Sequence, residues 1–372
     1  MLPFLAPSCG AHPVVSVTGH PLSFEKKFVS LLQRHHVLGA AVMLKSGNDT
    51  VLICTSSESP AHKAFADTYF RVASITKTAT AVLCMKLIEE CVLDPDRPVC
   101  ACFGSASVDS CLEGITLRHL LSHTSGLTDP PGLESSLEKG IPFTEILHGL
   151  HRKDPGSSFQ YSNLGFGLIG CVMEAALDKP VGQIFQDHLF RPLNMNATLE
   201  GCLLPAEQIM PVTRILPYHP GCDLILTALG SKPLLYPDPL RHYGHTAGSM
   251  YTDIGSLQKL FDILILNDGS FISSRMIQEM TNQHASYGRL SPSLSYGYGL
   301  LRIDDPEISD SIVLGHQGFA YGCADGAFWE VSSGRSLIML NGGASEARSG
   351  RLGLMNRDMM RWAFGKELPS WS

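Results

Sequence analysis

Three short strings of residues could together carry out acyl transfer through a serine ester. They are Ser74-Ile75-Thr76-Lys77, Tyr161-Ser162-Asn163 and His316-Gln317-Gly318, in this order along the chain. They supply a hydroxyl nucleophile, an amine and a phenol as proton carriers, and a strand with a tight turn that could lie along an acyl substrate. The residue types therefore predict chemistry through a covalent acyl-enzyme.

The first string stands at a predicted strand-to-helix junction. Ser74 follows the β-prone run 68–73 and precedes a helical pattern over 78–92. The amides at a helix start favour an anion that forms at the hydroxyl. We therefore prefer this serine to the others that are followed three places later by lysine, which are Ser23, Ser136 and Ser256.

Lys77 lies one helical turn after Ser74, so the two side chains share a helix face. Its neighbours are small or apolar, and desolvation would lower the pKa of the amine toward neutrality, as a general base requires. The alternative interpretation is a helix-capping serine beside a solvated lysine.

The second string follows the turn-rich stretch 154–158, so we expect it at a loop tip. A tyrosine there could take the Ser74 proton and pass it to the leaving group, while the Asn163 amide could hold the lysine or a substrate carbonyl. Residues 165–170 spell GxGxxG, but no buried strand precedes them. We interpret these glycines as close helix packing and not as a dinucleotide site.

The third string follows the apolar run 311–315, and strands are expected over 327–331 and 336–340, so an antiparallel meander with a glycine-containing turn is predicted. Gly318 removes a side chain where a substrate backbone would approach. The Phe319 amide could then donate to an oxyanion together with the Ser74 amide. The alternative is a half-buried strand histidine.

With these strings in order, the chain resembles the serine β-lactamase and penicillin-binding superfamily. It is most similar to the class C branch and the related esterases, D-amino-peptide hydrolases and acyltransferases. The similarity extends to residues 117–127, 247–251 and 296–299. The resemblance implies that Ser74 is the acylated nucleophile, Lys77 its activating partner and Tyr161 the general base and acid. The substrate-binding residues that it implies are Asn163, His316, Gln317, Gly318 and Phe319.

One departure from the family bears on the substrate. The lactamases usually carry Lys-Thr-Gly where this chain has His316-Gln317-Gly318, so a group of pKa about 6.5 replaces a permanent cation. Family members with histidine here are often esterases or peptidases, and hydrolysis of an ester or amide is therefore favoured over efficient penicillin turnover. If His316 must be neutral, activity falls below about pH 6. Acyl transfer from the same acyl-enzyme, and binding of peptides or acyl compounds without turnover, remain alternatives.

The elements that must position these groups follow from the hydrophobic pattern. A helix is expected over 24–36, strands over 40–44 and 51–55, and a strand edge over 70–73. Strands return from residue 296, and a last helix is expected over 351–364. The middle holds helical patterns at 117–123, 143–150, 166–176, 181–189 and 254–266, with a proline-rich loop region over 204–240.

This order predicts an α/β (α+β) fold of the β-lactamase/transpeptidase type. Its antiparallel sheet, flanked by helices, is built from both ends of the chain, as a discontinuous domain of residues 14–75 and 290–372. A mostly helical domain, 76–289, is inserted between them, and the cleft is expected at the junction.

Length, composition and net charge indicate which classes of binding partner to expect. The 372 residues, 44% hydrophobic, suffice for one catalytic unit. A net charge of -7 without basic clusters predicts no nucleic-acid or membrane partner. We expect a small-molecule or peptide acyl substrate, and the oligomeric state stays open.

The sequence also predicts the cellular compartment and the absence of a cofactor. The first residues lack the basic region and apolar core of a secretory signal. The eleven cysteines are odd in number and form no zinc-type CxxC pairs, so reduced thiols in a cytoplasm are expected. No cofactor or metal is expected, because histidine pairs such as His242/His245 lack convergent ligands.

Overall fold

The main sheet is antiparallel and is built from both ends of the chain. The computed structural model describes residues 14–18, 22–56, 62–103, 112–147, 150, 153–213, 232–320 and 322–365. Nine strands pair in the order β1-β3-β2-β12-β11-β10-β9-β8-β7, so β2 from the N-terminal part lies beside β12 from the C-terminal part. This arrangement confirms the predicted fold class. The strands are β1 (Val14–Thr18), β2 (Ala40–Ser46), β3 (Asp49–Thr55), β7 (Ala285–Ser286), β8 (Leu294–Tyr296), β9 (Leu301–Ile303), β10 (Val313–Ala320), β11 (Cys323–Glu330) and β12 (Ser336–Asn341).

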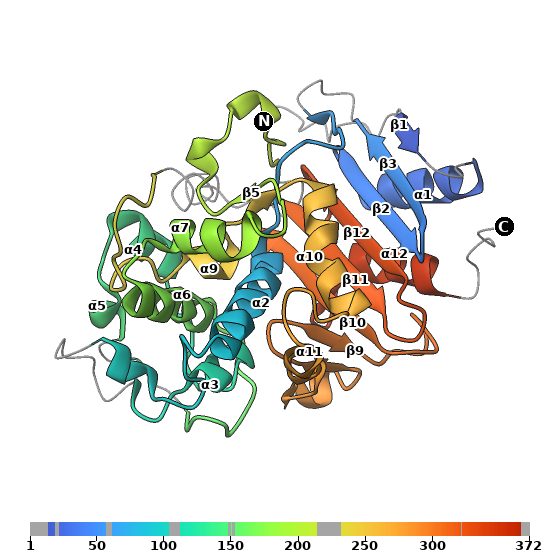
Figure 1. Cartoon of the computed structure of the whole chain (residues 1–372). Helices are drawn as coiled ribbons and strands as arrows, with labels where there is room; N and C mark the ends of the chain where they lie inside the picture. The colour runs from blue at the N-terminus through green and yellow to red at the C-terminus, as the bar shows by residue number, and fades with distance from the viewer. Residues whose placement is uncertain are drawn as a thin grey trace, which may run out of the picture.

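Helices cover both faces of this sheet, with α1 (Leu22–Arg34) and α12 (Leu354–Phe364) on one face and α10 (Ile254–Leu266) on the other (Figure 1). Because side chains alternate along a strand, β12 contributes Leu337 and Met339 to the core with α1 and α12. Ile338 and Leu340 belong to the core that includes α10. Each face of the sheet is therefore closed by its own apolar layer.

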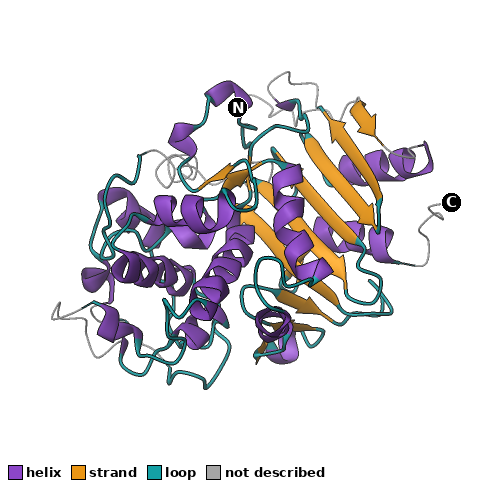
Figure 2. Cartoon of the chain, viewed as in Figure 1, coloured by secondary structure: helices purple, strands orange, loops and turns teal. Residues whose placement is uncertain are grey.

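Most of the remaining helices gather on one side of the molecule, beside the sheet (Figure 2). The helix α2 (Thr76–Glu89) lies at the boundary and is buried on all sides from Thr76 to Met85. A helix that is buried all round is a rigid core element, so residues on its first turn are firmly placed. The others are α3 (Leu117–Leu121), α4 (Leu133–Lys139), α5 (Phe143–Leu147), α6 (Asn163–Leu177), α7 (Val181–Phe185), α9 (His245–Gly248) and α11 (Ser274–Thr281). Among the described residues, no helix is long and apolar enough to cross a bilayer.

The glycines of residues 165–170 serve close packing, as predicted. They lie in α6, where a Cβ at Gly167 would collide with the Tyr243 carbonyl oxygen. A Cβ at Gly170 would lie 2.7 Å from the Thr246 Cγ2. These glycines let α6 and α9 approach each other.

Two local predictions were wrong, and one predicted helix begins three residues later than expected. The strand β4 (Phe70–Arg71) does not join the main sheet, because it pairs with β6 (Tyr251–Thr252), which also pairs with β5 (Ala197–Thr198). The string His316-Gln317-Gly318 lies within β10 and not at a turn, since its register with β11 continues to Ala320. The last helix begins at Leu354, because a short hairpin of β13 (Arg348–Ser349) and β14 (Leu352–Gly353) precedes it. Of the predicted loop region 204–240, residues 214–231 lie outside the described part.

Candidate active site

The predicted nucleophile lies at the start of α2. A short 3-10 turn, Ala73–Ile75, precedes the helix, and Ala73 has a left-handed φ of +45°. Such a conformation is strained in a non-glycine residue and is often found at functional sites. The Thr76 hydroxyl fixes the turn by donating to the Ala73 carbonyl oxygen at 2.6 Å and accepting from the Met250 amide at 3.1 Å. Ser74 is half-buried and lines a cavity of about 400 Å³.

Lys77 is fully buried and donates to three oxygens. Its Nζ lies 3.0 Å from Ser74 Oγ, 2.9 Å from Asn163 Oδ1 and 2.6 Å from the Ala247 carbonyl oxygen. Burial lowers the pKa of this amine to about 7, although the charge of Asp129 opposes the shift. The direction is the one that the apolar neighbours predict.

The partners of Lys77 determine where a lone pair would point. The Asn163 and Ala247 oxygens can only accept hydrogen bonds, whereas the Ser74 hydroxyl can also donate. When Lys77 is neutral, its lone pair is therefore best placed toward Ser74. This geometry suits the removal of a proton from the hydroxyl.

Tyr161 borders the same cavity, and the Lys77 Nζ lies 5.0 Å from the centroid of its ring. Burial raises the pKa of the phenol far above its usual value, while a hydrogen bond to Ser74 and the charge of Arg348 oppose the rise. The phenol is thus protonated near neutral pH. In this pocket it is better suited to donate a proton than to begin the reaction as a base.

Asp129 holds the second string in place, and sequence reasoning missed it. Its carboxylate accepts from Ser162 Oγ at 2.8 Å, from the Asn163 amide at 3.0 Å, from Asn163 Nδ2 at 2.9 Å and from the Leu164 amide at 2.9 Å. Since the Asn163 amide nitrogen is turned to Asp129, its oxygen faces Lys77. The carboxylate also lies at the start of α6, where the helix dipole favours a negative charge.

His123 supports Tyr161 from the other side, and it too was missed as a site residue. It has a left-handed φ of +56°, and its Nδ1 accepts from the Ser162 amide at 3.1 Å. The centroids of the His123 and Tyr161 rings are 4.2 Å apart. In the sequence, the one feature that could have identified His123 is its position in the segment 117–127, which resembles the family. Burial lowers the pKa of His123 well below its usual value, so the ring is neutral.

His316 is buried and neutral. Its Nδ1 donates to the Gln317 carbonyl oxygen at 2.7 Å, and its Nε2 is 2.9 Å from the Tyr296 hydroxyl, which therefore donates. Burial lowers the pKa of His316 to about 3, with the Lys77 charge acting in the same direction. The predicted loss of activity near pH 6 used the pKa of a solvated histidine, and the lowered pKa of His316 removes that basis.

The rest of β10 packs closely against the turn that carries Ser74. A Cβ at Gly318 would collide with the Val72 carbonyl oxygen, so glycine allows the strand to lie beside Ser74. Gln317 also lines the cavity. Its Nε2 donates to the Arg351 carbonyl oxygen at 2.6 Å, and its Oε1 accepts from the Gly353 amide at 3.0 Å. Phe319 lies under the Arg348 guanidinium, 4.1 Å from the ring centroid.

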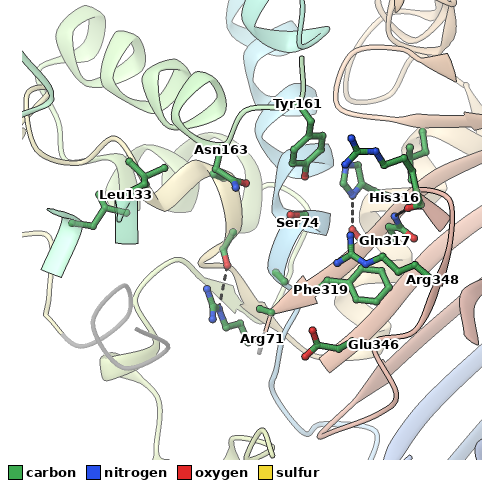
Figure 3. Close-up of a pocket in the computed structure, with 18 of the residues that line it drawn as sticks. Arg71, Ser74, Leu133, Tyr161, Asn163, His316, Gln317, Phe319, Glu346 and Arg348 are labelled. Carbon is green, nitrogen blue, oxygen red and sulfur yellow. Dashed lines mark hydrogen bonds between the residues drawn. The ribbon is translucent and has the colours of Figure 1, made fainter. Parts of the chain in front are cut away.

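The cavity thus brings together groups from all three strings (Figure 3). Tyr161, Ser74 and Asn163 lie on one side of the view, and the side chains of β10 and the β13–β14 hairpin lie on the other. Within the described part of the chain, no group of three or more His, Cys, Asp or Glu side chains could hold a metal ion. The site offers a serine hydroxyl, an amine of lowered pKa and a neutral phenol.

Comparison with known proteins gives consistent matches. A family model described as Beta-lactamase matches residues 24–339. Esterase EstB from Burkholderia gladioli is 26% identical over an alignment 330 residues long, which covers 78% of this chain and 82% of the esterase. The structure of EstCE1, a hydrolase with promiscuous acyltransferase activity, aligns with a TM-score of 0.71 at 20% identity, over 90% of this chain and 98% of that chain. The D-amino acid amidase from Ochrobactrum anthropi SV3 aligns with a TM-score of 0.68 at 21% identity, over 88% and 92%.

Proposed function

The chain belongs to the Beta-lactamase family, and we propose that it is a serine hydrolase that cleaves esters or amides through an acyl-enzyme on Ser74. The observation that carries the proposal is the 3.0 Å contact between Ser74 Oγ and the buried amine of Lys77. The esterase and amidase activities named for two similar proteins support this substrate class. From cysteine usage alone, we also propose that the protein works in a reducing compartment such as the cytoplasm.

Acylation begins with neutral Lys77. The amine takes the hydroxyl proton as Ser74 Oγ forms a bond to the substrate carbonyl carbon, and the carbonyl oxygen becomes an oxyanion. The backbone amides of Ser74 and Phe319 are the proposed donors to this oxyanion. The proton then reaches the leaving group, directly or through the Tyr161 hydroxyl, as the bond to that group breaks.

Deacylation repeats these steps with water. Lys77, neutral again, takes a proton from the attacking water, directly or through Tyr161, and returns it to Ser74 Oγ as the acyl group leaves as a carboxylic acid. A direct test is incubation with short 4-nitrophenyl esters and a fluorophosphonate. We expect catalytic release of 4-nitrophenol and a covalent mass increase on the peptide that contains Ser74. Absence of both results would contradict the proposal.

The pKa of Lys77 predicts the pH dependence. Because the neutral amine is the base and its pKa is about 7, kcat/KM should rise about tenfold per pH unit below pH 7 and level off above about pH 8. His316, whose pKa is about 3, should add no step between pH 5 and 8. The measurement is kcat/KM for a 4-nitrophenyl ester across this range. A flat profile down to pH 5 would exclude Lys77 as the base.

Asp129→Asn should alter both rate and pH profile. The carboxylate raises the pKa of Lys77, so its neutralisation should move the midpoint of the profile to lower pH. Loss of a charged acceptor of four hydrogen bonds should also lower the plateau of kcat/KM about tenfold. The matched control is Asp187→Asn, which removes a surface carboxylate that pairs with Lys179 and Arg191. A lower rate with an unmoved midpoint would assign Asp129 a purely structural role.

Gly318→Ala should displace β10 from the nucleophile turn. Since the new methyl group would collide with the Val72 carbonyl oxygen, we expect kcat/KM to fall at least about tenfold through the misplaced oxyanion donors. The control is Gly255→Ala in α10, where the nearest atom to a Cβ would be Asp253 Oδ1 at 3.5 Å. Equal activity of the two variants would show that the close approach at Gly318 is dispensable.

A further inference from the structure

A second tyrosine, Tyr287, lines the cavity together with Tyr161. It follows β7 directly, and its backbone amide donates to the Leu294 carbonyl oxygen at 3.2 Å. Its side chain is half-buried, and its hydroxyl forms no hydrogen bond with the residues that the structure describes. A phenol can both donate and accept a hydrogen bond. The Tyr287 hydroxyl is therefore open to a molecule in the cavity.

The other phenols around the site already have partners. The Tyr161 hydroxyl bonds the serine hydroxyl. Tyr296 donates to His316 Nε2 at 2.9 Å, and Tyr243 donates to a backbone carbonyl oxygen at 2.7 Å. Burial raises the pKa of the Tyr287 phenol far above its usual value. Tyr287 thus offers a protonated hydroxyl that no part of the described chain engages.

Aromatic packing holds Tyr287 and Tyr161 at the same cavity. The ring centroid of Tyr287 lies 4.2 Å from that of Phe159. The Phe159 centroid lies 5.8 Å from that of His123, which in turn lies 4.2 Å from that of Tyr161. Tyr161 adds to the rise in the pKa of Tyr287, while the charge of Arg351 opposes it. Since packed rings have little freedom to move, the open hydroxyl has a defined position.

Tyr161 identifies the side of the cavity from which water attacks. During acylation, a proton reaches the leaving group directly or through Tyr161, whose hydroxyl is turned toward Ser74 (Figure 3). Deacylation reverses these steps with water in place of the leaving group. The attacking water therefore occupies the position that the leaving group vacates, on the side of the cavity that Tyr161 and Tyr287 line.

We propose that Tyr287 is a catalytic residue of deacylation, which selects water over alcohols as the acceptor of the acyl group. The inference rests on the proposed hydrolase function. A water molecule has two protons. It gives one to Lys77, directly or through Tyr161, as its oxygen bonds the acyl carbon, and it donates the other in a hydrogen bond to Tyr287 Oη. The bond from the acyl carbon to Ser74 Oγ then breaks, Oγ takes back the first proton, and the carboxylic acid leaves.

A simple alcohol cannot make the same pair of contacts. It has one hydroxyl proton, which the amine of Lys77 must remove when the alcohol attacks. No second proton is left for the Tyr287 oxygen. The hydrogen bond to Tyr287 therefore lowers the barrier for water and leaves the barrier for an alcohol unaltered, so it favours hydrolysis over acyl transfer to alcohols.

The test compares water and methanol as acceptors in the full-length protein. A 4-nitrophenyl ester is turned over at pH 8 with methanol at a fixed concentration, and chromatography gives the ratio of methyl ester to carboxylic acid. Tyr287→Phe removes the hydroxyl alone and should raise this ratio about 3- to 10-fold, the usual effect of one hydrogen bond. Because kcat/KM reports acylation, it should not change, whereas kcat should fall and a burst of 4-nitrophenol should appear as the acyl-enzyme accumulates.

The matched control is Tyr236→Phe, which removes the hydroxyl of a tyrosine that is 63% exposed and lies outside the described lining of the cavity. It should leave the product ratio and both kinetic constants unaltered. A wild-type ratio in Tyr287→Phe, or an equal fall in kcat and kcat/KM at an unaltered ratio, would overturn the inference and leave the hydrolase function in place. Absence of 4-nitrophenol release and of fluorophosphonate labelling in the wild type would contradict the proposed function and the inference with it.

Discussion

Ser74→Ala should lower kcat/KM for 4-nitrophenyl esters by about 10⁴-fold or more and abolish labelling by a fluorophosphonate. The expected loss is this large because the acyl-enzyme cannot form without the hydroxyl, and removal of the nucleophile in serine hydrolases has effects of that order. The fold should be kept, since Ser74 is half-buried and lines the cavity. Thermal unfolding and circular dichroism check this.

The control is Ser136→Ala, which removes the hydroxyl of another serine followed three places later by lysine. Among the contacts that the structure describes, its hydroxyl donates only to the carbonyl oxygen of Gly132, the residue before α4. Full activity of this control, with loss in Ser74→Ala, would assign the nucleophile. A stoichiometric mass increase on wild-type Ser74 without product release would instead support a binding protein. Release of an ester or amide of an added alcohol or amine would support an acyltransferase.

Lys77→Met should lower kcat/KM by about 10³-fold. The methionine side chain fits a similar volume and removes the base, and general-base catalysis typically contributes about 10²- to 10⁴-fold. Lys77→Arg should be about equally inactive, because a guanidinium keeps the charge and does not deprotonate. The measurement is steady-state hydrolysis of a 4-nitrophenyl ester at pH 8.

The matched control is Lys86→Met on the same helix, where the amine pairs with Glu90 in an i,i+4 contact. It should keep full activity. If Lys77→Arg retained more than a tenth of the wild-type rate, the base would have to be another group, and Tyr161 would be the next candidate. A loss of pH dependence in Lys77→Met would independently identify Lys77 as the titrating group.

The variants of Ser74 and Lys77 test two residues that could be identified from the sequence. Ser74 lies in the 3-10 turn that leads into α2 and Lys77 lies in the first turn of α2, so their proximity follows from local helical geometry. The helix α2 was predicted for the same reason, and it was observed over Thr76–Glu89. The order of strands and helices likewise follows from hydrophobic periodicity, which is a local property.

Other features of the site depend on residues far apart in the chain. Asp129 acts on residues more than thirty positions away, and nothing in its own neighbourhood indicates that contact. The pKa of His316 falls because the folded protein buries it against Tyr296. We expected the strand edge at 70–73 to belong to the main sheet, but β4 pairs with β6. The sequence near β4 could not show this, because the partner of a strand is set only when distant segments meet.

The residue types and local patterns by themselves determined the turn that carries Ser74, the position of Lys77 beside it, and the antiparallel sheet built from both ends of the chain. The tertiary structure decided the charge state of the groups in the pocket. It keeps the histidine of β10 neutral, lowers the pKa of Lys77, and brings in two arginines from the β13–β14 hairpin. The physical reason is that helix and strand propensities act over a few residues, whereas desolvation and charge pairing depend on which distant side chains the completed fold places around each group.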